Sequence, residues 1–97
     1  IMDILQWLQT WFAQNCVDDW QHFYGIKIET LDNPGWHIDI DLSSTEVENK
    51  PFQEIYQDFE NDMSWLHCKV TNKIFSAACS PNNLVTVLEI FKSWIEE

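Results

Sequence analysis

The chain has 97 residues, of which 45% are hydrophobic and 14% aromatic, and its formal net charge is −11 at pH 7. This composition is typical of a folded globular protein and excludes a disordered or fibrous chain. The excess of acids disfavours direct nucleic-acid binding, because proteins neutralise phosphates with Lys and Arg, and it favours a basic protein partner. Alternatively, the acidity serves only solubility.

Length and cysteine content bound the organisation of the chain and its compartment. We expect residues 1–97 to form one domain with a single core. No apolar run approaches the ~20 residues of a membrane span, and no signal peptide is visible, so we expect no membrane association. Three cysteines without a CxxC pair indicate a reducing, cytoplasmic environment.

Residues 3–15 are predicted to form an amphipathic helix. Asp3 can cap this helix, and Gln6 three residues later completes a capping-box pattern. The apolar residues fall on one side of the helix: Ile4, Leu5, Trp7, Leu8, Trp11 and Phe12. We interpret the tryptophans as packing residues rather than as a ligand cage.

A β-hairpin is predicted next, with strands at 23–31 and 36–42. Apolar residues alternate with other residues along both segments. The sequence NPGW at 33–36 suits a type II turn, in which Pro presets φ and Gly supplies a positive φ. This loop pairs Thr30 with Trp36 and places the apolar side chains of both strands on one face.

The middle of the chain is predicted to contain a short helix and a second hairpin. Residues 51–59 have apolar side chains at helical spacing, which predicts the helix. The second hairpin has strands at 64–70 and 74–79, with its turn at 71–72 or 72–73. Its register places Cys68 opposite Phe75 or Ala77 rather than Cys79, so no disulfide is expected.

The C-terminal segment is predicted to be a helix at 81–96, capped by Ser80 and with Pro81 at its first position. The element order is then α-β-β-(α)-β-β-α. This order predicts an α+β fold, in which an antiparallel four-stranded sheet of two hairpins packs against N- and C-terminal helices. We expect the helices on one face of the sheet and an open face opposite.

Polar side chains gather on the predicted open face. The candidate site residues are Glu29, His37, Asp39, Asp41, Trp65 and His67, with Lys69 beside them. His and carboxylate groups suit a divalent metal, but side chains two apart on a strand lie about 6.5–7 Å apart and converge poorly on one ion. The spacing therefore favours a solvated surface or a partner-docking surface, and an indole at Trp65 among charges favours docking.

Enzyme motifs are missing from the sequence. It contains no GxSxG, P-loop, HExxH or GxGxxG pattern, and its two glycines leave little for a phosphate-binding loop. The thiolate of Cys16 is disfavoured by the charges of Asp18 and Asp19. Cys68 and His67 are neighbours on a strand and therefore face opposite ways. We predict a protein that is not an enzyme and that needs no cofactor, metal or small-molecule ligand.

Four stretches carry a family resemblance that covers nearly the whole chain. They are the opening MDILQWLQTWF, the stretch DWQHFYGIKIETLDNPGW from Asp19 to Trp36, the strand around Trp65, Cys68, Lys69 and Val70, and PNNL from Pro81 before a helix ending in Phe91 and Trp94. In these stretches the chain resembles the bacterial family catalogued as immunity protein 53.

The resemblance implies an intracellular immunity protein of a polymorphic toxin system, which binds a cognate secreted toxin domain and protects the producing cell. Many such toxins are nucleases with basic clefts, to which an acidic partner is suited. We therefore predict a non-enzymatic inhibitor whose partner is a toxin protein with a basic surface. A generic acidic protein-interaction module is the alternative, and a small metal-dependent hydrolase is a more distant one.

Overall fold

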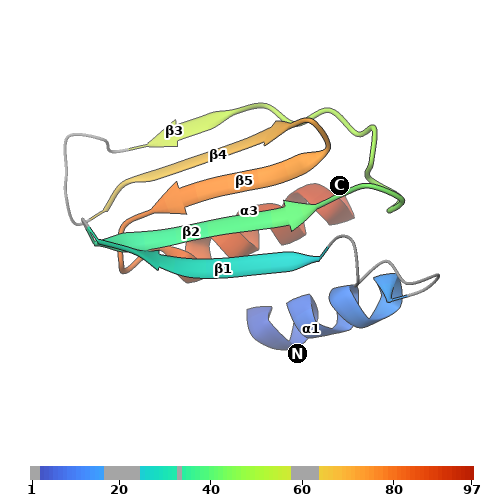
Figure 1. Ribbon diagram of the computed structural model, residues 1–97, viewed down its shortest axis with the longest axis horizontal. Coiled ribbons are helices and arrows are strands. Elements are labelled where there is room, and N and C mark those ends of the chain that lie inside the picture. The colour runs from blue at the N-terminus through green and yellow to red at the C-terminus, as the bar shows by residue number, and fades with distance from the viewer. Residues whose placement is uncertain (1–2, 17–24, 33, 58–63) are drawn as a thin grey trace.

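The computed structural model describes residues 3–16, 25–32, 34–57 and 64–97. Within these ranges helices flank an antiparallel sheet in an α+β arrangement, which confirms the predicted fold class (Figure 1). In chain order the elements are α1 (Ile4–Asn15), β1 (Ile26–Leu31), β2 (Gly35–Asp41), β3 (Ile55–Gln57), β4 (Leu66–Thr71), β5 (Ile74–Cys79) and α3 (Leu84–Glu96).

The strands form one five-stranded sheet in the order β1-β2-β5-β4-β3, with every neighbouring pair antiparallel. The two hairpins are joined side by side through the pairing of β2 with β5. In Figure 1 α3 lies behind the sheet, and α1, which packs on α3, is drawn below β1. As expected, no described helix covers the opposite face, which we call the open face.

The sheet has five strands rather than the predicted four, because the predicted helix at 51–59 is wrong. Ile55–Gln57 instead forms β3, in which Ile55 pairs with Cys68 and Tyr56 with His67. Apolar residues three and four apart fit a helix, but the period of so short a run does not distinguish a helix from a strand. Residues 55–57 form a strand instead, because their backbone N–H and C=O groups gain hydrogen-bond partners at the edge of β4. Residues 58–63 lie outside the described residues.

The first hairpin has the predicted register, with Thr30 opposite Trp36 and the apolar residues of both strands on the core face. However, β2 begins at Gly35, whose φ of 159° differs from that of a type II turn. Glycine is needed there because a Cβ would overlap the carbonyl oxygen of Cys79. Residues 23–24 and 33 of the predicted hairpin lie outside the described residues.

The second hairpin also has the predicted register. Cys68 pairs with Ala77, and Cys79 pairs with Leu66. The turn is at 72–73, where both residues have a positive φ (54° and 64°), the pattern of a type I′ turn. All three cysteines are free thiols.

The helices pack through their apolar sides on each other and on the sheet. Trp11 of α1 lies edge-on to Phe91 of α3, with ring centroids 5.2 Å apart. Both belong to the main core cluster together with Leu88, so Trp11 is a packing residue, as predicted. Leu5, which was predicted on the apolar side of α1, is instead 62% exposed. No helix in the described part of the chain is long and apolar enough to cross a membrane.

The sequence predicted one helix start correctly and one wrongly. In the predicted capping box of α1, the Asp3 carboxylate accepts a hydrogen bond from the backbone N–H of Gln6 at 2.8 Å. The backbone N–H of Asp3 in turn donates to the side-chain oxygen of Gln6 at 3.2 Å. By contrast, α3 begins later than predicted, with Asn83 rather than Ser80 at its N-cap. Ser80 still belongs to the sheet hydrogen-bond pattern, because its N–H donates to the carbonyl of Trp65 at 2.9 Å.

Candidate functional site

One row of side chains crosses the open face from edge to edge. Its cross-strand pairs are Glu29–His37, His37–Ala78, Ala78–His67 and His67–Tyr56. Ala78 stands between the two histidines, and its methyl group makes no polar contact with either. The row therefore divides into two polar clusters, one on β1 and β2 and the other on β3 and β4.

In the β1–β2 cluster, His37 lies between two carboxylates. Its Nδ1 is 3.7 Å from Oε1 of Glu29 and 3.5 Å from Oδ2 of Asp39. The Nζ of Lys27 is 3.8 Å from the same Glu29 oxygen. The side chains of Glu29 and Asp39 are 49% and 36% exposed, so water screens these contacts and each contributes little to stability. The fold thus brings three predicted site residues together and leaves their carboxylates accessible.

The β3–β4 cluster surrounds His67. Its Nε2 lies 2.8 Å from Oε2 of Glu54, and the ring of Tyr56 stacks on the imidazole with centroids 3.8 Å apart. Desolvation and the Glu54 carboxylate raise the pKa of the Tyr56 phenol above its ordinary value. The sequence analysis missed Glu54 and Tyr56 because it placed them in a helix. Strand alternation across 54–56 would have put both beside His67.

The other predicted residues lie at the margins of the open face. Asp41 ends β2, and its Oδ1 accepts a hydrogen bond from the backbone N–H of Ser43 at 2.9 Å, so this carboxylate also stabilises the following turn. Trp65 immediately precedes β4 and is partly buried. Its carbonyl accepts hydrogen bonds from the Ser80 N–H at 2.9 Å and from Nδ2 of Asn83 at 3.1 Å.

The described residues offer little for metal binding or nucleophilic catalysis. Among them, no group of three or more His, Cys, Asp or Glu side chains is arranged to hold a metal ion. Cys68 and Cys79 are fully buried in the core, where desolvation raises their pKa values to about 12 and about 11. Thiols with such pKa values stay protonated near neutral pH and are poor nucleophiles.

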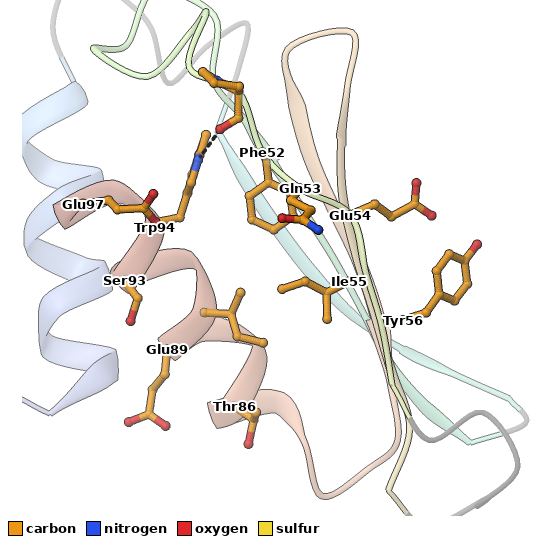
Figure 2. A pocket seen from close by; sticks show the side chains of 12 residues that line it. Phe52, Gln53, Glu54, Ile55, Tyr56, Thr86, Glu89, Ser93, Trp94 and Glu97 are labelled. Atoms are coloured by element: carbon orange, nitrogen blue, oxygen red, sulfur yellow. Dashed lines mark hydrogen bonds between the residues drawn. The ribbon is translucent and has the colours of Figure 1, made fainter.

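A groove of about 840 Å³ lies between the segment 51–56 and α3 (Figure 2). Phe52 anchors the segment, because its ring packs edge-on against Phe75 and Trp94, with centroids 5.5 and 5.4 Å away. The indole Nε1 of Trp94 donates a hydrogen bond to the carbonyl of Pro51 at 2.8 Å. These contacts hold the two walls of the groove together at one end.

The groove combines an apolar lining with acidic residues. Its apolar lining residues include Phe52, Ile55, Ile90 and Trp94. Glu54, Glu89 and Glu97 are its charged residues, and the described residues that line it include no Lys or Arg. In Figure 2 Ile55 points toward α3, whereas Tyr56 points away from it. The strand β3 therefore lies between the groove and the open face and contributes side chains to both.

A family model described as Immunity protein 53 matches residues 5–96 of the chain. No curated protein and no solved structure matches it.

Proposed function

The chain belongs to the immunity protein 53 family, and on this premise we propose that it binds and neutralises a cognate secreted toxin through the open face of its sheet. Family membership by itself indicates a toxin-neutralising role. The face and the residues are our assignment. The contact residues that we assign are Glu29, His37, Asp39, Asp41, Trp65 and His67.

The charge of the chain supports a toxin with a basic surface. The net charge is −11, and residues 29–62 contain ten acids and one lysine. Such a field attracts a basic partner and raises the rate of encounter. A nuclease has to attract phosphates with basic residues, so we propose a nuclease as the class of toxin that this surface suits best.

The arrangement of the two clusters supports specific docking beyond general attraction. His37 lies beside both Glu29 and Asp39, so the three side chains present one polar group to a partner. The stacked rings of Tyr56 and His67 offer a rigid aromatic surface, and aromatic residues are enriched at the centres of protein interfaces. The face thus combines charge for steering with aromatic surface for affinity.

Inhibition by binding requires no chemistry from the immunity protein. We propose that it acts in the cytoplasm of the producing cell and occludes or distorts the active site of the toxin. The raised pKa values of Cys68 and Cys79 are consistent with a non-catalytic role. We do not propose binding to nucleic acid, a membrane or a small molecule.

Co-expression with the toxin domain encoded by the neighbouring gene tests this proposal. The wild-type chain should restore growth, and Glu29→Lys with Asp39→Lys should weaken both rescue and binding to an inactive form of the toxin. The matched control is Glu46→Lys with Glu96→Lys, which makes the same change in net charge at exposed positions away from the face. Failure of the wild-type chain to rescue growth would overturn the function. Equal effects of the two double variants would overturn the assigned face.

A further inference from the structure

We propose that the groove between the segment 51–56 and α3 receives an extended strand of the toxin, which pairs with the outer edge of β3. This inference rests on the proposed function and assigns a second contact, separate from the open face. The strand that fits carries apolar side chains together with Lys or Arg.

Strand β3 lies at the edge of the sheet. In the order β1-β2-β5-β4-β3, β3 pairs with β4 on one side and has no described strand on the other. An edge strand presents backbone N–H and C=O groups to which another extended chain can add. With only three residues, Ile55–Gln57, β3 provides few such positions, so side-chain contacts have to supply the remaining affinity.

One side of α3 borders the groove. Its lining residues follow helical spacing along one side of α3: Thr86, Glu89, Ile90, Ser93, Trp94 and Glu97. Of these only Trp94 is buried, and Thr86, Glu89, Ser93 and Glu97 are exposed. This side of α3 is therefore largely uncovered where it borders the groove, and those side chains of a strand added to β3 that point to the helix side of the sheet would face it.

The lining of the groove offers both apolar surface and carboxylates. Ile55, Ile90 and Phe52 are only partly buried and leave apolar surface in the groove. Glu89 and Glu97 lie beside this surface, and the described residues that line the groove include no Lys or Arg, whereas Lys50 contacts the carbonyl of Glu97 at one end and Lys92 lines a neighbouring pocket with Glu89. Apolar side chains with one or two Lys or Arg residues complement this combination, and they also match the basic toxin surface proposed for the open face.

The groove and the open face adjoin each other at the segment 54–56. Tyr56 belongs to the β3–β4 cluster, and its neighbour Ile55 points into the groove (Figure 2). Glu54 lines the groove and also contacts His67 on the open face. One toxin can therefore touch both surfaces across β3, and a strand at this edge continues the sheet without displacing any described element.

The test uses an inactive variant of the toxin domain encoded by the neighbouring gene. Glu89→Lys should weaken its binding about tenfold or more, because a cation at this position repels the Lys or Arg of the strand. The control is Glu96→Lys, an identical substitution on the same helix at an exposed residue outside the groove. Thermal unfolding of both variants verifies that each is folded. Amide hydrogen exchange supplies an independent readout, since strand addition should protect in the complex those amides of 55–57 that point away from β4.

The outcomes distinguish the groove from the function. Binding that is lost in Glu89→Lys but kept in Glu96→Lys, with protection at 55–57, supports the proposal. A second outcome is that Asp39→Lys weakens binding, that Glu89→Lys and Glu96→Lys bind equally well, and that the amides of 55–57 stay unprotected. This outcome would overturn the strand in the groove and leave the proposed function standing. If the wild-type chain does not bind the toxin, both fail. Self-association of the free chain that Glu89→Lys abolishes would assign the groove to a second copy and overturn the proposal.

Discussion

Lys50 contacts Trp94 at the end of α3 in two ways: its Nζ donates a hydrogen bond to the backbone carbonyl of Trp94 and lies 5.6 Å from the centroid of the indole ring. The same Nζ donates to the carbonyl of Glu97 at 3.3 Å. The last carbonyls of a helix have no partner within the helix, and a cation there also complements the helix dipole. Since Trp94 also donates to Pro51, these contacts fix one end of the groove.

We predict that Lys50→Met lowers the free energy of unfolding by about 1–3 kcal/mol, because the carbonyls of Trp94 and Glu97 lose a charged donor. Lys27→Met is the control. Its side chain is 68% exposed and makes an ion pair at 3.8 Å, so its removal should cost less than about 0.5 kcal/mol. Urea denaturation of both variants measures the difference. Equal losses would show that Lys50 does not stabilise the end of α3.

Truncation of the helix interface tests the core. Trp11→Ala and Leu88→Ala should each cost roughly 2–5 kcal/mol, since both side chains belong to the main buried cluster. Leu5→Ala removes a side chain that is 62% exposed and should change stability little. Chemical denaturation provides the values. Losses below about 1 kcal/mol at both buried positions would contradict the packing of α1 on α3.

The two glycines form a matched pair for testing the close approach of β2 and β5. Both have a positive φ, but a Cβ at Gly25 has no neighbour within 4 Å, whereas one at Gly35 overlaps the carbonyl oxygen of Cys79. Gly35→Ala should therefore destabilise the protein by about 1–3 kcal/mol more than Gly25→Ala. Thermal or urea unfolding compares them. Similar losses in the two variants would mean that the strands adjust at no cost.

The buried thiols predict how stability depends on alkaline pH. Burial raises the pKa of Cys68 from 9.0 to about 12 and that of Cys79 to about 11. The unfolded chain therefore loses these protons first as pH rises, and the stability that is present below pH 9 decreases between pH 9 and pH 11–12. Cys68→Ala should show a shallower decrease than the wild-type chain over this range. Identical slopes would contradict the raised pKa values.

The same thiols predict the covalent state of the chain. Mass spectrometry of unreduced, denatured protein should find all three cysteines open to alkylation. A mass lower by two hydrogens, with one reactive thiol, would show a disulfide and contradict the register that places Cys68 opposite Ala77.

Association and dissociation kinetics separate charge from apolar contact on the open face. Asp39→Lys should mainly slow toxin binding, and this effect should shrink as added salt screens charges beyond a Debye length of about 8–10 Å. Trp65→Ala should mainly speed dissociation, by an equivalent of about 1–3 kcal/mol if the indole is an anchor. Surface plasmon resonance at two salt concentrations measures both rates. An Asp39→Lys variant that binds as fast as the wild-type chain at low salt would exclude this carboxylate from steering.

Alternation predicted the hairpins well because a slip of one residue would turn every apolar side chain to the wrong face. The pair Thr30–Trp36 follows from this constraint together with the loop length, whereas alternation left Cys68 opposite Phe75 or Ala77 until the turn at 72–73 selected Ala77. Alternation also predicted that Glu29, His37 and Asp39 lie on the uncovered side of the sheet. The register of the first hairpin then places Glu29 opposite His37, but the sequence does not show that β2 pairs with β5.

The errors arose where contacts distant in sequence decided the local structure. The apolar spacing of 51–59 fits a helix, but Phe52 packs against Phe75 and Trp94, and β4 offers an edge to pair with. Ser80 has the side chain of a good helix cap, yet it directly follows β5 and its N–H donates to the carbonyl of Trp65 beside the end of β4. The groove could not be predicted, because it depends on how β3 and α3 are placed relative to each other.

The pairing of β2 with β5 has a consequence for synthesis of the protein. Trp36 and Cys79 are partners in this ladder, so the central strand of the sheet is the last strand in the chain. A ribosome that adds about 5–20 residues per second must translate the other four strands before β5 can join the two hairpins. The first hairpin lacks this neighbour until then, and α3, which follows β5 in the chain, covers the core later still. A message cut short before β5 would yield two hairpins that have no central strand to join them.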